Sequence, residues 1–307
     1  MKSFAHRTDI GLVRERNEDV CESFSIKVKN QDIYCAILAD GMGGHQAGEI
    51  ASQIFLEIAK DIIQSLVAKN LSYVNWRAVI ESIFFQANQF IFDTAKRINK
   101  DGMGTTGVIT IVDGNKLIGG WVGDSRIYRY SKKNLHQLSK DHSIVQLLID
   151  NGHIGKEEGR YHPKKHILLR AIGTSADECY PDIVEYSLQS EDLVLLCSDG
   201  LSGKLYDEEI ASIIEFGLDK ESQILHKYKT DSDKTVDLKE EILKNDPLYY
   251  ITGLLISKAK EYGGEDNISV CMLKSEQQGN NFWENLRKLW SNSNRKKTVK
   301  IPVLPDL

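Results

Sequence analysis

Strand-like segments in this sequence occur in clusters, and the two longest helical segments follow each other directly. Apolar runs and alternations predict strands over residues 20–28, 33–39, 108–112, 116–123, 126–130, 193–198 and 268–273. Two helices are predicted between the second and third strands, one with isoleucine at every fourth position from Ile50 to Ile62 and one over residues 76–96. Because strands and helices do not alternate, this order favours antiparallel sheets with helices laid on them, an α+β fold, over a doubly wound parallel sheet.

Two internal regions differ from this core. Residues 141–180 are irregular and hold a short helix over residues 143–151, which Gly152 ends and which Asp141 is placed to cap. Residues 219–247 are polar and charged, which predicts an exposed and partly helical insertion. We expect a single domain over residues 1–274, followed by a tail over residues 275–307.

The tail carries a predicted helix with one apolar face, formed by Phe282, Trp283, Leu286, Leu289 and Trp290. Arg287, Lys288 and the basic run at residues 295–297 make this helix amphipathic and cationic. Two interpretations stay open for it. The apolar face docks onto the parent domain, or it binds a partner or a membrane surface.

Composition excludes several classes of protein. The 307 residues are 41% hydrophobic and 27% charged, as in ordinary globular proteins. A net charge of -5 argues against nucleic acid as a partner. The N-terminal segment has no apolar stretch typical of a secretory signal, and no segment approaches about 18 consecutive apolar residues. Five scattered cysteines without a C-x-x-C pair need no oxidising compartment, so the cytoplasm is the expected location.

Acidic residues follow or precede the predicted strands at several separate places. Asp40-Gly41 ends one apolar run, and Asp199-Gly200 ends another in the same way. The remaining acidic positions at strand ends are Glu18, Asp19, Asp124 and Asp266. Each one alone is typical of a turn. Together they predict a cluster, since strands that lie side by side would bring these carboxylates to one place.

Converging carboxylates repel one another unless a cation neutralises them. Hard divalent ions take oxygen ligands, whereas no His-rich or Cys-rich spacing supports zinc. The cluster therefore predicts Mg or Mn, and the number of acids predicts more than one ion. Two ions about 3.5–4 Å apart would bridge a water molecule, convert it to hydroxide and hold it for in-line attack on a phosphoryl group. Arg14 could bind two phosphate oxygens through its guanidinium.

Several sequence blocks resemble the metal-dependent serine/threonine protein phosphatases of type 2C, the PPM family, in its bacterial form. These blocks are, in the family's order, GLVRERNED (11–19), LADGMGGHQAGEIAS (38–52), GMGTT (102–106), GGWVGDSRIYRY (119–130), LSKDHSIVQLLIDNG (138–152), HPKKHILLRAIGT (162–174), LLCSDGLS (195–202) and GGEDNISV (263–270). The resemblance implies a four-layer αββα sandwich of two antiparallel sheets flanked by helices. It also implies that residues 141–180 form a flap beside the active site.

The resemblance assigns roles to individual positions. It implies that the two catalytic ions, Mg or Mn, are bound directly by Asp40, Asp199, Asp266 and the carbonyl group of Gly41. Glu18 and Asp19 match acids that act largely through metal-bound water, and Arg14 matches the arginine that binds the substrate phosphate. Asp124 matches a ligand of a weakly held third ion. Where the family often has a further aspartate for that ion, this chain has Gly203.

The proton donor to the leaving group is less defined than the metal ligands. Eukaryotic family members use a histidine at the position of Met42. His45 and metal-bound water are the two alternatives here. His162 is predicted to be a flap residue near the substrate.

These observations predict a cytoplasmic, Mg- or Mn-dependent phosphatase for phosphoserine and phosphothreonine, in which a metal-bridging hydroxide attacks phosphorus without a phosphoenzyme. Its expected partners are phosphoproteins, the targets of a cognate serine/threonine kinase, and not nucleic acids. Two alternatives are an inactive relative that serves as a binding module and a two-metal phosphodiesterase or nuclease. The retained acids argue against the first, and the acidic charge balance argues against the second.

Overall fold

A computed structural model describes residues 3–28, 31–43, 47–68, 74–177, 179–230 and 247–274. Its side chains are described except those of residues 220–230. His45, residues 231–246 of the expected insertion and the tail over residues 275–307 lie outside the described residues. Among the described helices, none combines the length and the apolar character that crossing a bilayer requires.

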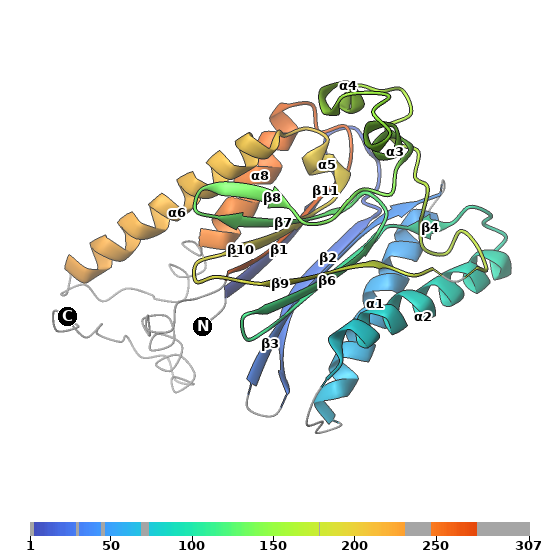
Figure 1. Cartoon of the computed structure of the whole chain (residues 1–307), viewed down its shortest axis with the longest axis horizontal. Helices are drawn as coiled ribbons and strands as arrows, with labels where there is room; N and C mark the ends of the chain where they lie inside the picture. The colour runs from blue at the N-terminus through green and yellow to red at the C-terminus, as the bar shows by residue number, and fades with distance from the viewer. Residues whose placement is uncertain are drawn as a thin grey trace.

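Two antiparallel sheets pack face to face, and helices cover both outer faces (Figure 1), which confirms the αββα sandwich. The first sheet contains, in spatial order, β1 (Ser3–Asp9), β11 (Ile268–Lys274), β10 (Leu193–Cys197), β7 (Arg126–Ser131) and β8 (Asn134–Gln137). The second contains β2 (Asp19–Val28), β3 (Gln31–Met42), β5 (Gly107–Asp113), β6 (Lys116–Val122) and β9 (Asp182–Ser187). The short β4 (Gly104–Thr105) pairs with the end of β3.

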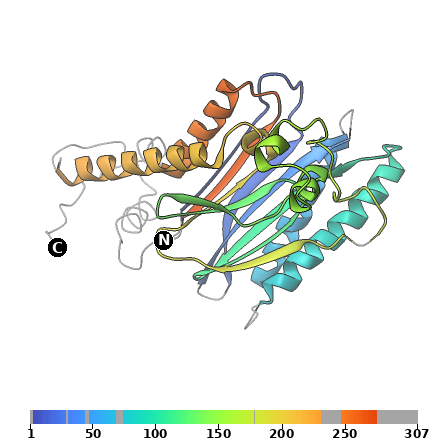
Figure 2. The same cartoon turned by 45° about the horizontal axis from the view of Figure 1, so that its top comes forward.

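Two pairs of long helices form the outer layers. The second sheet is covered by α1 (Ala47–Ala68) and α2 (Trp76–Arg97), and the first sheet by α6 (Asp207–Thr230) and α8 (Pro247–Glu261). Three short helices lie near one end of the sandwich: α3 (Ile144–Asp150), α4 (Lys156–Arg160) and α5 (Asp199–Ser202). Figure 2 turns the top of the molecule forward and shows α3 and α4 over the ends of the strands.

Three layers of buried apolar side chains hold this arrangement together, one beneath each pair of helices and one between the sheets. Successive residues of a strand point to opposite faces of its sheet, so neighbouring residues belong to different layers. In β10, Leu195 belongs to the core beneath α6 and α8, whereas its neighbour Leu196 belongs to the core between the sheets. Both side chains are fully buried. A central strand of this fold is therefore apolar on both faces, which is why its sequence reads as a continuous apolar run.

In α1, the isoleucine row that predicted the helix is not the most deeply buried row. Ile50 is 36% exposed, whereas Ala51, Phe55, Ala59 and Ile63, each one position later, are fully buried. The isoleucines flank this row because an apolar stripe on a helix is wider than a single line of residues. The helix itself is confirmed, although its inner face is centred on the row that begins at Ala51.

Candidate active site

The strand register brings the predicted acids to one end of the sandwich. Asp19 on β2 stands directly opposite Asp40 on β3. Asp199 follows β10, and Asp266 precedes the neighbouring strand β11. Asp124 lies in the turn that carries the chain from β6 in the second sheet to β7 in the first. Both sheets thus contribute acids to the same site.

Burial and mutual repulsion disfavour the charged forms of these acids. Burial, together with the charges of Asp199 and Asp266, raises the pKa of Asp19 to about 7. For the same two reasons the pKa values of Asp40 and Asp124 lie well above their usual range, and the pKa of Asp199 is also raised. A nearby cation would reverse these shifts and keep the carboxylates ionised at neutral pH.

Two buried carboxylate oxygens have no hydrogen-bond partner in the described part of the chain. They are the Oδ1 atoms of Asp19 and Asp199. The other oxygen of Asp19 accepts a 2.7 Å hydrogen bond from the hydroxyl of Ser198. Buried acceptors are normally satisfied, so these two atoms fit oxygen ligands of Mg or Mn.

Within the described residues, no three His, Cys, Asp or Glu side chains gather as a complete ligand set. The fit of the site to divalent ions therefore rests on the two unpartnered oxygens and on the repulsion among the carboxylates. The donor chemistry agrees with this fit, because all the groups are hard oxygen donors.

Two threonines from the GMGTT block hold the backbone of Asp40. The hydroxyl of Thr106 accepts a hydrogen bond from the amide of Asp40 at 2.9 Å, and the Thr106 amide donates to the Asp40 carbonyl at 2.8 Å. The hydroxyl of Thr105 donates to the same carbonyl oxygen. Thr106 also contacts the hydroxyl of Ser125, which follows Asp124, at 2.8 Å. These bonds connect the Asp40 backbone to the turn that carries Asp124.

Gly41 lies where β3 passes close to the start of α1. A Cβ atom at Gly41 would lie 2.1 Å from the carbonyl oxygen of Gly48, so this position accepts no side chain. Its amide donates to the carbonyl of Glu18 at 3.1 Å, and Ser52 on α1 donates to the same carbonyl oxygen. Glu18 itself has a raised pKa, mainly because of burial. Strand and helix thus jointly fix the backbone beside Asp40.

The loop that carries Arg14 is fastened by Asn267, the residue after Asp266. The amide group of Asn267 donates to the carbonyls of Ile10 and Arg16, and its oxygen accepts from the amide of Glu18 at 2.8 Å. Arg14 donates to Asp266 at 2.9 Å while half of its side chain stays exposed. The structure therefore places Arg14 at the rim of the acidic site.

A pocket of about 370 Å³ joins the acids to the flap. It is lined by Asp124, Asp199 and Asp266 on one side and by residues from α3, α4 and the following turn on the other. His166 lines this pocket. His162 is not among the lining residues, and its Nδ1 atom accepts a hydrogen bond from the amide of Lys164 at 3.1 Å. The structure thus brings a different flap histidine to the site from the one that the sequence suggested.

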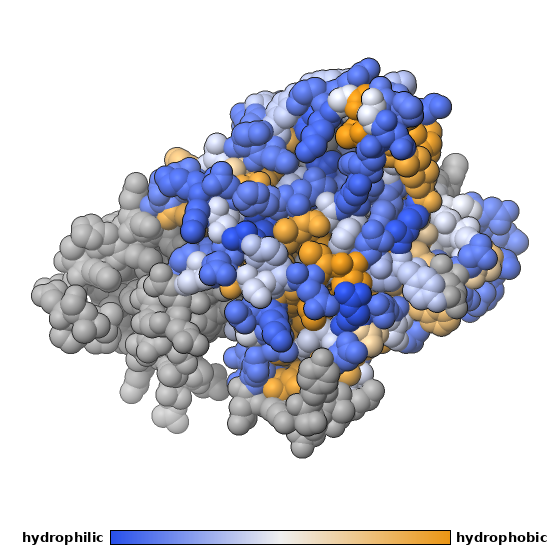
Figure 3. All heavy atoms as spheres, viewed as in Figure 1, coloured by the Kyte–Doolittle hydropathy of each residue, from blue (hydrophilic) through white to orange (hydrophobic). Residues whose placement is uncertain are grey.

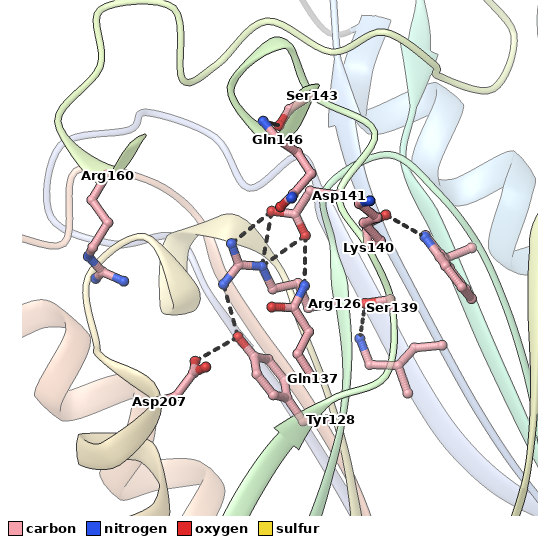
Figure 4. A network of polar contacts seen from close by, with 12 residues as sticks. Arg126, Tyr128, Gln137, Ser139, Lys140, Asp141, Ser143, Gln146, Arg160 and Asp207 are labelled. Carbon is pink, nitrogen blue, oxygen red and sulfur yellow. Dashed lines mark hydrogen bonds and ion pairs between the residues drawn. The ribbon is translucent and has the colours of Figure 1, made fainter. Parts of the chain in front are cut away.

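Asp141 does not cap α3 as the sequence suggested, because Ser143 does so by accepting from the amide of Gln146. Asp141 instead forms an ion pair with Arg126, with its shortest contact at 2.7 Å, and accepts from Gln137 at 3.0 Å. Figure 4 shows these side chains pointing toward one another.

The same network reaches a third element. Arg126 donates to the hydroxyl of Tyr128 at 3.0 Å, and that hydroxyl donates to Asp207 at the start of α6 (Figure 4). Strand β7, the beginning of the flap and α6 are therefore tied together beside Asp124. No local sequence pattern indicates this network, because the ion pair joins residues that are 15 positions apart in different elements.

The sequence and the structure both match known proteins. The family model described as "Protein phosphatase 2C" matches residues 11–232. The curated relative named "Serine/threonine phosphatase stp" from Listeria monocytogenes is 33% identical over 271 residues, which is 88% of this chain and 94% of the relative. "Protein phosphatase PhpP" from Streptococcus pneumoniae is 33% identical over 276 residues, covering 88% and 96%.

Two solved structures show the same fold. The S. agalactiae serine/threonine phosphatase has a TM-score of 0.72 and 30% identity, with coverage of 90% of this chain and 100% of that one. The catalytic domain of the serine/threonine protein phosphatase PstP, in complex with two manganese ions, has a TM-score of 0.68 and 28% identity, with coverage of 90% and 99%.

Proposed function

The chain belongs to the protein phosphatase 2C family and is a serine/threonine phosphatase, and from this premise we propose that it dephosphorylates phosphoserine and phosphothreonine with two bound Mg or Mn ions. The observation that carries this proposal is the convergence of buried carboxylates from both sheets, two of which have an unpartnered oxygen. A related catalytic domain with two manganese ions supports the choice of metal.

Asp40, Asp199 and Asp266 would bind the two ions together with the carbonyl of Gly41, and Glu18 and Asp19 would act through bound water. Asp124 would bind a third ion weakly, because Gly203 supplies no carboxylate. When bound, the ions neutralise the phosphoryl oxygens and activate a water for in-line attack, so no phosphoenzyme is needed.

Arg14 is the residue that would position the substrate. Its guanidinium contacts Asp266 at 2.9 Å and remains half exposed, so it can reach an incoming phosphate without leaving the site. A planar guanidinium binds two phosphate oxygens at once, which fixes the direction of the phosphorus–oxygen bond to be broken.

The proposed setting is the cytoplasm, with phosphoproteins modified by a cognate serine/threonine kinase as substrates. All five cysteines are free thiols, which agrees with a reducing compartment. The tail over residues 275–307 would dock a partner, a membrane surface or the parent domain.

The test is hydrolysis of para-nitrophenyl phosphate and of a phosphothreonine peptide by the purified full chain, with Mn, with Mg and with EDTA. We expect turnover only with a divalent ion, and a loss of at least about 100-fold in Asp199→Asn. Asp32→Asn, at the β2–β3 hairpin far from the acids, should keep normal turnover. Calorimetry that detects no Mn binding, or cleavage of single-stranded DNA or a cyclic dinucleotide in place of the peptide, would contradict the proposal.

A further inference from the structure

The pocket beside the acidic site has two walls of opposite charge. One wall carries the acids at the strand ends, Asp124, Asp199 and Asp266. The opposite wall belongs to α4 and the turn that follows it, and its cationic residues are Lys156, Arg160 and Lys165, with His166 beside them. Ions bound by the acids would occupy only the first wall. The cations of the second wall would still lack an anionic ligand.

The cations of the flap wall are not neutralised as the other cations of the pocket are. Arg126 is paired with Asp141, and Lys204 is paired with Glu265. No carboxylate of the described residues forms an ion pair with Lys156 or Lys165. These two lysines line the pocket from exposed positions.

Arg160 anchors this wall to the segment that follows α5. It donates to the carbonyl of Leu205 at 3.2 Å, and its guanidinium lies 4.1 Å above the ring of Tyr206. In Figure 4 it descends from the flap toward the loop that leads into α6. Because Arg160 connects α4 to the segment that follows α5, the lysines on the same wall stay close to the acids.

Gly203, which lines the pocket between the walls, contributes no side chain. Around α4, at the top of Figure 3, hydrophilic side chains surround a small hydrophobic patch.

We propose that this flap wall is a subsite for an anionic side chain next to the phosphorylated residue of the substrate. The inference rests on the proposed function, which places the phosphoryl group against the acids. Neighbouring residues of an extended peptide are about 3.5 Å apart along the chain, so a residue one or two positions away can reach the lysines across a pocket of this size. An aspartate, a glutamate or a second phosphorylated residue would supply the required charge.

The test compares kcat/KM for four phosphothreonine peptides that differ only in the flanking residues: aspartate, alanine, lysine or a second phosphoserine. Exposed ion pairs are weak individually, so two lysines should give the aspartate peptide an advantage of about threefold to tenfold over the alanine peptide. High salt should reduce that advantage, because exposed charges are screened. The ratio between the two anionic peptides shows whether a carboxylate or a phosphate suits the subsite better.

The double variant Lys156→Gln/Lys165→Gln should bring the aspartate-to-alanine ratio close to one, and Lys156→Glu/Lys165→Glu should favour the lysine peptide. Lys27→Gln/Lys116→Gln removes the same charge at the far end of the second sheet and should keep the wild-type ratio. A wild-type ratio of one, or an unchanged ratio in the glutamine variant, would overturn the inference. Absence of any Mn-dependent hydrolysis of para-nitrophenyl phosphate by the wild type would instead overturn the proposed function.

Discussion

Asp19 shows at the scale of one residue how a functional acid reduces stability. Burial and neighbouring carboxylates raise its pKa from 3.8 to about 7 in the folded protein. The unfolded chain therefore loses this proton first as the pH rises. The folded state then becomes less favourable between about pH 4 and pH 7, because it must either retain the proton or bury the charge.

We predict that the free energy of unfolding of the protein in EDTA is about 2 to 4 kcal/mol lower at pH 7.5 than at pH 5, with Asp19 as the main cause of the difference. Urea unfolding followed by tryptophan fluorescence measures this difference. Saturating Mn at pH 7.5 should remove much of it, since the ions compensate the carboxylates. A metal-free protein that is more stable at pH 7.5 than at pH 5 would contradict the prediction.

Residue by residue, the charged members of the site were easier to predict than the neutral ones. Asp40 and Asp199 stand out because a bare carboxylate ends an apolar run at both places. Ser198, which donates to Asp19, and Thr106, which holds Asp40, look like ordinary polar residues at strand ends. Their roles depend on contacts across 179 and 66 positions, which no local pattern records.

At the scale of elements, the Arg126–Asp141 ion pair joins β7 to the start of the flap. Its carboxylate is only 10% exposed, so removing that charge leaves a largely buried guanidinium without its partner. We predict that Asp141→Ala lowers the free energy of unfolding by about 3 kcal/mol and makes the flap more sensitive to limited proteolysis.

Asp150→Ala is the matched control, because Asp150 lies in the same flap but pairs with Lys140 at the surface. It should change unfolding little, as exposed ion pairs contribute little. Equal effects of the two substitutions in urea unfolding would show that the buried network does not anchor the flap.

The approach of β3 to α1 at Gly41 leads to a second prediction for an element. Gly41→Ala would place a methyl group 2.1 Å from the Gly48 carbonyl, so strand and helix must separate. We expect a loss of about 2 to 4 kcal/mol in stability and weaker Mn binding, since Asp40 lies next to this contact. Gly155→Ala, with no atom within 4 Å of the new methyl group, should leave both quantities nearly unchanged in thermal unfolding and calorimetry.

Helix α8 (Pro247–Glu261) and the first half of α6 were missed from the sequence, and the missed strands are edge or short strands. β1 and β9 are edge strands in which polar residues interrupt the apolar pattern, and β8 has only four residues. Such strands are half exposed and short, so their apolar signal is weak. The central strands were predicted because two covered faces require a continuous apolar run.

For the whole molecule, the site lies at the junction of the two sheets. Asp19 and Asp40 come from the second sheet, and Asp199 and Asp266 from the first. The order of elements predicted antiparallel sheets with helices outside, and the resemblance supplied the four layers. The register that sets Asp19 opposite Asp40, and the order of strands within each sheet, depend on long-range pairing that a single sequence does not display.

Because both sheets supply acids to the site, ions that bind there should stabilise the complete sandwich. We predict that Mn at about 100 times its dissociation constant raises the melting temperature by roughly 5 to 10 °C, and that Asp199→Asn abolishes this rise. Differential scanning calorimetry against Mn concentration measures it. A wild-type melting temperature that is independent of Mn would rule out metal sites at this junction.

The helix α6 begins beside the acids and runs away from them for 24 residues, about 36 Å, before α8 returns the chain to the same end. The two described ends of this connection, Thr230 and Pro247, therefore lie far from the acids, so an insertion between them should leave the acidic site intact. A fluorescent reporter protein inserted between Thr230 and Pro247 should therefore leave phosphatase activity unchanged.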